Sequence, residues 1–131
     1  MGPQDCSAMM LETVSLMRGK VIDSSLDGCQ CEVYGAPLFL SVLESPAGSY
    51  IVGRMHLAPM VVEESGSQLL YAMYMNAKLS ETFGLPIWLG MDMDENRLLA
   101  CFSVSTIELT ADKLAETLLP LEEIAKLRFE F

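Results

Sequence analysis

The side chain best suited to acid–base chemistry in this sequence is its single histidine. His56 could serve as a general base or as a metal ligand. No serine or cysteine nucleophile stands near it in a sharp-turn context, and one histidine cannot build a His-rich zinc site. We therefore interpret His56 as a residue on the polar face of a strand, beside Arg54, and not as a catalytic group.

The cysteines are the second candidate for chemistry, because Cys29 and Cys31 are separated by a single residue. Redox pairs usually have two intervening residues at a helix N-terminus. A four-thiolate metal site would also need Cys6 and Cys101, and the paired spacing of such sites is absent. In a strand, Cys29 and Cys31 point to one face, which predicts core cysteines. With ten methionines in the chain, we expect reduced thiols and a cytosolic protein.

The segment Asp92-Met-Asp94-Glu-Asn96 resembles the start of a calcium-binding loop, because oxygen-bearing side chains alternate along it. The resemblance fails at Arg97, where a glycine is required, and at Ser103, where the distal glutamate belongs. A hairpin turn with solvated acids explains the pattern better. Neighbouring glutamates elsewhere are typical of exposed helix ends, and no glycine-rich phosphate loop occurs. The sequence therefore predicts no catalytic residues, no metal and no cofactor, and hence a protein that is not an enzyme.

Composition limits the possible partners. The 131 residues carry a net charge of −10, with 18 acidic and 8 scattered basic side chains, and 51% of the residues are hydrophobic. This length predicts a single domain, 1–131. The charge argues against nucleic acid and anionic membranes as partners, because no basic stripe exists to neutralise phosphates. No apolar run approaches the roughly 18 residues that would span a bilayer. A polypeptide is the favoured partner.

The first half of the chain reads as one helix followed by three strands. Met10, Val14 and Met17 recur at i, i+4 and i+7, which predicts an amphipathic helix over residues 7–18. Alternating runs at 29–34, 38–44 and 50–57 predict strands. The short turn segments between these runs favour antiparallel pairing.

The second half begins with the strongest helix of the sequence, residues 65–83. It is apolar around most of its circumference, which predicts that other parts of the protein pack against it on more than one side. Another subunit could supply one of these packing surfaces. Runs at 87–94 and 98–105 predict a hairpin, and residues 110–131 predict a closing helix that Pro120 kinks or splits. The order α-β-β-β-α-β-β-α indicates an α+β fold, a twisted antiparallel sheet flanked by helices.

Three local patterns in the second half carry a family resemblance. These are Leu69-Leu70-x5-Asn76, Gly84-Leu-Pro-Ile-Trp-Leu-Gly-Met-Asp92, and Asn96-Arg97-Leu98-Leu99 followed by a closing helix. Together with the element order and the acidity, they make the sequence similar to class I type III secretion chaperones, the Tir chaperone family. The element order extends the resemblance along nearly the whole chain.

The resemblance implies a homodimer in the bacterial cytosol that binds the N-terminal region of a secreted effector. It implies that the effector segment stays extended, adds strands to sheet edges and inserts apolar side chains into grooves, so that it remains soluble and secretion-competent. The dimer surface implied for this chain consists of Leu70, Tyr74, Ile87, Trp88, Leu89 and Met91. The implied effector-binding residues are Leu11, Val14, Met17, Leu38, Leu40, Val42, Ile51 and Met55.

Two other functions compete with this one. The first is a regulatory protein-binding domain of the same topology that has no secretion client. The second is a small thiol-dependent enzyme built on Cys29, Cys31 or Cys101.

Overall fold

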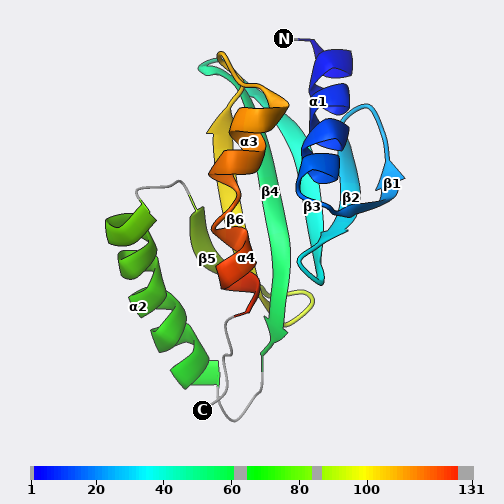
Figure 1. The fold of residues 1–131 in the computed structure, drawn as a ribbon. Coiled ribbons are helices and arrows are strands. Elements are labelled where there is room, and N and C mark those ends of the chain that lie inside the picture. The colour runs from blue at the N-terminus through cyan, green and yellow to red at the C-terminus, as the bar shows by residue number, and fades with distance from the viewer. Residues whose placement is uncertain (1, 61–64, 84–86, 127–131) are drawn as a thin grey trace.

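The fold is a six-stranded antiparallel sheet with helices packed against it (Figure 1). A computed structural model describes residues 2–60, 65–83 and 87–126. Its elements in chain order are α1 (Pro3–Leu16), β1 (Lys20–Ser24), β2 (Gly28–Val33), β3 (Ala36–Ser45), β4 (Gly48–Pro59), α2 (Ser65–Phe83), β5 (Ile87–Asp92), β6 (Arg97–Ser105), α3 (Ala111–Thr117) and α4 (Leu121–Ala125).

The strands lie in the order β1-β2-β3-β4-β6-β5, and every neighbouring pair is antiparallel. The first four strands form a meander, because short turns join each to the next. After β4 the chain passes through α2 and returns as the β5–β6 hairpin, with β6 pairing to β4. The sheet therefore ends in β1 on one side and in β5 on the other.

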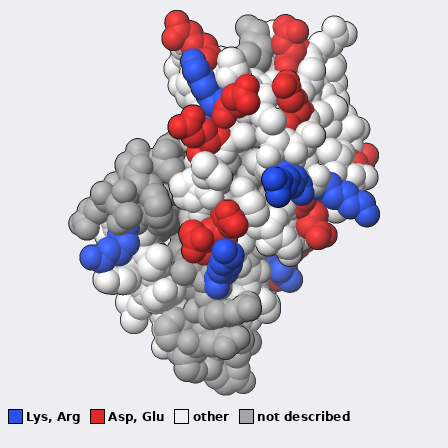
Figure 2. All heavy atoms as spheres, viewed as in Figure 1, with Lys and Arg blue, Asp and Glu red and all other residues white. Residues whose placement is uncertain are grey.

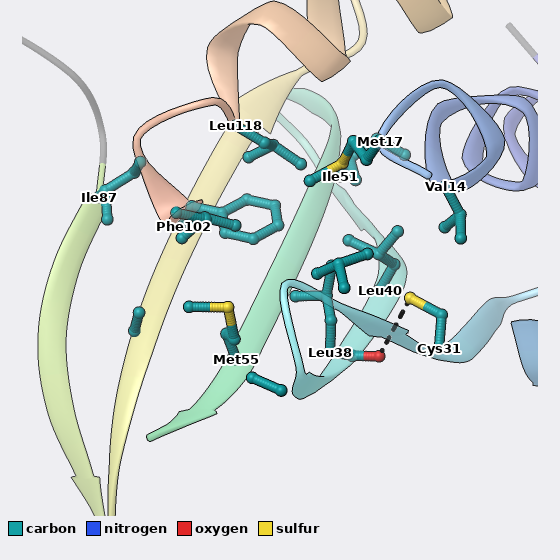
Figure 3. Packing of buried hydrophobic residues seen from close by; sticks show 14 of the residues in the cluster. Val14, Met17, Cys31, Leu38, Leu40, Ile51, Met55, Ile87, Phe102 and Leu118 are labelled. Carbon is teal, nitrogen blue, oxygen red and sulfur yellow. Dashed lines mark hydrogen bonds between the residues drawn. The ribbon is translucent and has the colours of Figure 1, made fainter. Parts of the chain in front are cut away.

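Helices α1, α3 and α4 cover one face of the sheet, whereas α2 stands beside β5 at the sheet edge (Figure 1). The core lies between these three helices and the sheet. Figure 3 shows Met17 of α1, Ile51 of β4 and Leu118 at the end of α3 pointing into this space. Each fully buried aliphatic side chain of this kind contributes about 1.5–3 kcal/mol, so this face holds the domain together.

The predicted α+β fold is confirmed, and the middle helix has the predicted bounds, Ser65–Phe83. The first helix begins earlier than expected, at Pro3, because proline suits the first helical position and Asp5 accepts a hydrogen bond from the Gly2 nitrogen at 3.3 Å. The predicted turn at 84–86 and the end of the closing helix, 127–131, lie outside the described residues.

One prediction about the elements was wrong. The sequence predicted no strand between the first helix and Cys29, but Lys20–Ser24 forms β1. Of the two outcomes expected at Pro120, a kink or a split, the structure has the split: α3 ends at Thr117, and Pro120 stands at the N-cap of a separate α4. Proline favours this break because it lacks the N–H that a continuous helix needs.

Gly53 permits the closest approach of a core side chain to the sheet. A Cβ at this position would overlap the ring of Phe102, the buried residue that pairs with it across β4 and β6. Only a residue without a side chain lets the Phe102 ring come this close to β4.

We therefore expect Gly53→Ala to lower the free energy of unfolding by about 1–3 kcal/mol, because the Phe102 ring must leave its position. Gly66→Ala is the matched control, since a Cβ on Gly66 meets no atom within 4 Å and alanine favours the helix. Urea denaturation followed by circular dichroism measures both. Equal midpoints for the two variants would contradict this account of Phe102.

Candidate functional site

The sheet face opposite α1, α3 and α4, here called the outer face, carries one row of side chains that crosses all six strands. The strand register places these residues side by side, each paired with the next. In order from β1 to β5 they are Asp23, Gln30, Phe39, Arg54, Cys101 and Trp88. No described helix contributes to this row.

A cavity of about 510 Å³ lies over this row, here called the outer-face groove. All of its lining residues come from strands or from the β1–β2 turn. The aromatic rings of Phe39 and Trp88 line it from different strands, and Trp88 remains 45% exposed. A half-exposed tryptophan beside a groove is a favourable contact for an apolar partner.

Arg54 gives the outer-face groove a positive charge in an otherwise acidic protein. Its guanidinium lies 6.0 Å from the centroid of the Phe39 ring, within the range of a cation–π contact. In the described part of the chain, no carboxylate lies within ion-pair distance of Arg54. Burial raises the pKa of the adjacent Cys101 thiol, and the charge of Arg54 offsets part of that effect. The Cys101 thiol is therefore protonated at neutral pH.

The other three cysteines lie in the core, as predicted. Cys31 donates a hydrogen bond from Sγ to the Leu38 carbonyl oxygen at 3.4 Å (Figure 3). The neighbouring Cys29 thiol raises the pKa of Cys31, and burial raises it further. The Cys31 thiol in turn lowers the pKa of Cys29, although burial opposes this shift. Burial also raises the pKa of Cys6. Thiols held protonated in this way are poor nucleophiles.

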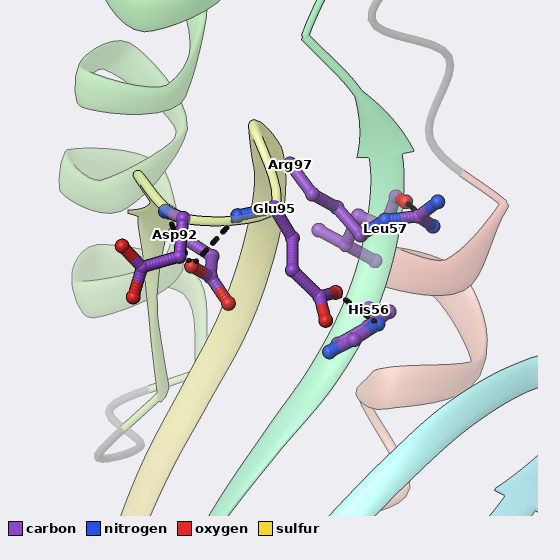
Figure 4. A network of polar contacts seen from close by, with 6 residues as sticks. His56, Leu57, Asp92, Glu95 and Arg97 are labelled. Atoms are coloured by element: carbon purple, nitrogen blue, oxygen red, sulfur yellow. Dashed lines mark hydrogen bonds and ion pairs between the residues drawn. The ribbon is translucent and has the colours of Figure 1, made fainter.

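His56 belongs to a polar cluster around the β5–β6 turn (Figure 4). Its Nδ1 atom lies 3.9 Å from the Glu95 carboxylate, and its ring centroid lies 4.9 Å from that of Phe39. Asp92 accepts hydrogen bonds from the backbone nitrogens of Asp94 at 2.9 Å and Glu95 at 3.2 Å. Asp92 therefore fixes the turn, as the hairpin interpretation predicted. Among residues 2–60, 65–83 and 87–126, no group of three or more potential metal ligands is present.

Helix α2 has one apolar side directed away from the rest of the molecule. Gln68 and Ala72 are buried, and α2 contacts the sheet mainly at β5. Its other side, here called the α2 stripe, is formed by Leu69, Leu70, Met73 and Tyr74, which are exposed.

The structure divides the predicted dimer residues into two groups. Leu70 of the α2 stripe is 68% exposed, and Tyr74 and Trp88 are also exposed. Ile87 and Leu89 are buried in the core, and Met91 packs against it. The first group is therefore available to a partner, whereas Ile87 and Leu89 support β5 from within.

Most of the predicted effector-binding residues lie in the core. Leu11 and Val42 are partly buried and pack against it. The remaining six are at most 7% exposed: Val14, Met17, Leu38, Leu40, Ile51 and Met55. A client could not contact these six side chains unless the covering helices moved away from the sheet. The residues that sequence reasoning missed are their neighbours in the same strands, which point to the outer face: Phe39, Ser41, Val52 and Arg54.

Strand β1 is an open edge, a feature that sequence reasoning also missed. Among the described strands it pairs only with β2, and all five of its residues are exposed. A bulge between Val21 and Asp23 leaves Ile22 without a pairing partner and 55% exposed. Leu16 at the end of α1 and Leu26 in the β1–β2 turn, on either side of β1 in the chain, add exposed apolar surface. An edge of this kind can pair with an added strand.

The helix-covered face has a different character. Figure 2 shows acidic side chains gathered over α1 and α3, where Glu12 and Asp112 are among the exposed residues. Basic side chains are scattered across the same view. No described helix is long and apolar enough to cross a membrane.

No protein-family model matches the chain, and no curated protein matches it in sequence. The chain is similar to one from a solved structure of the HopA1-SchA chaperone-effector complex, with 16% sequence identity and a TM-score of 0.62. The match covers 95% of this chain and 92% of that one. The two chains therefore share the α+β fold described above.

The burial of the thiols predicts how the native protein reacts with Ellman's reagent. At pH 7 all four cysteines should react slowly, with Cys101 first because it is the only one of the four that is not fully buried. Because burial raises the Cys101 pKa, its rate should keep increasing as the pH rises above the usual cysteine range.

Cys101→Ser is the control variant, and it should remove the first phase of the reaction. Cys6, Cys29 and Cys31 should react only on unfolding. Rapid labelling of Cys29 or Cys31 at pH 7 would contradict this picture and would favour the thiol-dependent enzyme.

Proposed function

We propose that this chain is a bacterial cytosolic chaperone. Acting as a homodimer, it binds the N-terminal segment of a type III secreted effector and keeps that segment soluble and secretion-competent. The observation that carries this proposal is the uneven covering of the sheet. One face is packed under helices, while the outer-face groove and the β1 edge remain open to another chain. The fold similarity to a chain of a chaperone-effector complex supports the same conclusion.

The β1 edge is the site at which a client strand is added. Its outward backbone N–H and C=O groups supply affinity for any extended segment, regardless of sequence. Val21, Ile22 and Leu16 give that segment apolar contacts beside the edge. The bulge at Ile22 interrupts the ladder, so the added strand pairs over a short stretch on one side of it.

The outer-face groove takes apolar or aromatic side chains of the client. Phe39 offers a ring surface, and Arg54 favours segments that carry a carboxylate or an aromatic ring. The client contacts proposed here thus lie on the opposite side of β3 and β4 from the buried residues Leu38 and Met55.

The dimer forms through the α2 stripe. Helix α2 has 19 residues and is therefore about 28 Å long, so one face about 10 Å wide covers roughly 300 Å². Stable interfaces bury about 800 Å² on each partner. The α2 stripe alone is too small, and the dimer surface must extend to Trp88, the exposed aromatic side chain of β5.

No catalytic activity is part of this proposal. The pKa values of Cys6, Cys31 and Cys101 are raised, and Cys29, whose pKa is lowered by Cys31, is only 7% exposed. His56 lies beside the Glu95 carboxylate at the β5–β6 turn, and the proposal gives it no role as a base. A regulatory protein-binding domain would use the same surfaces, and the identity of the client separates the two functions.

The client site is tested by co-expression with the N-terminal regions of proteins encoded by neighbouring genes, followed by size exclusion and light scattering. We expect a complex of two chaperone chains with one client. Ile22→Lys should weaken it roughly tenfold or more, because a charge on an edge strand opposes strand addition.

Ile107→Lys is the matched control, because Ile107 is 75% exposed in the turn after β6 and lies away from the β1 edge. It should bind the client as the unaltered chain does. Equal loss of binding in both variants would overturn the β1 site. Failure of every neighbouring gene product to bind would favour the regulatory domain.

The dimer is tested by Leu70→Glu and Trp88→Glu. Each places a charge in the proposed interface, so the dissociation constant should rise roughly a hundredfold and the protein should elute as a monomer or become insoluble. Ile107→Glu adds the same charge elsewhere and should remain dimeric. A soluble dimer of Trp88→Glu in light scattering would remove Trp88 from the interface.

A further inference from the structure

The β5 edge differs from the β1 edge because a side chain of α2 forms hydrogen bonds with backbone groups of β5. The Leu89 nitrogen donates to Asn76 Oδ1 at 2.5 Å, and Asn76 Nδ2 donates to the Leu89 carbonyl oxygen at 3.0 Å. In an antiparallel ladder, successive residues direct their backbone groups to opposite sides. Leu89 therefore points its backbone groups outward, away from β6, toward the position where a further strand would pair.

An asparagine side chain is suited to this position because its amide resembles a peptide group, with one carbonyl acceptor and N–H donors. The two bonds with Leu89 reproduce the pair that an antiparallel strand residue would make. Leu89 is only 5% exposed, so without Asn76 its backbone groups would lack a partner in a poorly solvated place.

Further contacts hold α2 in the position that allows these bonds. Two turns earlier on the helix, Gln68 Nε2 donates to the Pro59 carbonyl oxygen at 3.3 Å. Gln68 and Ala72 are both buried on the side of α2 that faces the sheet. The helix is therefore fixed along β5 by apolar packing and by two side-chain amides.

We infer that Asn76 determines where strands can be added to this sheet, by closing the β5 edge. At the opposite edge, β1 pairs only with β2 among the described strands and is exposed throughout. An incoming strand is thereby directed to β1, a consequence that rests on the proposed function. The closure of β5 itself does not depend on that function.

Other residues would not close the edge. Leucine has a similar volume but neither donor nor acceptor. Aspartate keeps an acceptor for the Leu89 N–H but has no donor for its carbonyl oxygen. Asn76→Leu should therefore leave both Leu89 backbone groups without a partner, and Asn76→Asp should leave only the carbonyl oxygen without one.

The test measures amide hydrogen exchange of Leu89 in the full chain, together with molecular mass by light scattering over a range of protein concentrations. In the unaltered protein the Leu89 amide should exchange slowly. In Asn76→Leu it should exchange at least about tenfold faster, since a buried donor loses its acceptor. The same variant should form larger, concentration-dependent species, because an open edge pairs with other edges.

Ala77→Leu is the control, because it adds the same side chain at the next, exposed position of α2 without touching Leu89. It should match the unaltered chain in Leu89 amide exchange. Asn76→Asp should keep the Leu89 amide better protected than Asn76→Leu does.

Rapid Leu89 exchange in the unaltered protein would overturn the inference, and this measurement decides even where Asn76→Leu fails to fold. Unchanged exchange and mass in a folded Asn76→Leu variant would also overturn it. Neither measurement uses a client, so such a failure is distinct from a failure of the proposed function.

Discussion

Packing of α1, α3 and α4 against one face of the sheet is the interaction on which the rest of the structure depends. It buries the inward residues of the central strands, such as Leu38 and Ile51, and supplies the apolar burial that stabilises the domain. These helices cover that single face, so in the described residues the outer face stays open. That face consequently mixes rings such as Phe39 with polar side chains such as Arg54, a composition compatible with water and with a bound segment.

The same asymmetry explains why the effector-binding residues could not be chosen from sequence. Alternation shows that Leu38 and Phe39 point to opposite faces, but it does not say which face the helices cover. Both faces of β3 and β4 carry apolar residues, so the pattern is ambiguous. The set predicted to bind the effector includes Leu40 and Met55, which lie in the core. Phe39 and Arg54, which line the outer-face groove, are one position away in the same strands.

Other elements followed from local signals, and the failures had local causes. The α2 helix was predicted with its observed bounds because its apolar residues are dense over 19 positions. The β1 strand was not predicted, because a bulge at Ile22 breaks the alternation of its side chains between the two faces and because none of its residues is buried. The role of Pro120 was left open between a kink and a split, and the structure has the split, with Pro120 at the N-cap of α4.

Helix α2 illustrates how one element can serve two surfaces. Its apolar circumference is divided between β5, against which Ala72 is buried, and the α2 stripe, where Leu70 and Tyr74 are exposed. Asn76 interrupts the apolar character on the β5 side, a position where an apolar residue would pack as well. Its polarity is explained by the edge of the sheet, since Leu89 needs a hydrogen-bonding partner there. A helix that only covered β5 would need no exposed stripe, and one that only formed a dimer would need no asparagine facing β5. Both features together indicate a helix that ends the sheet within its own chain and offers its remaining side to another.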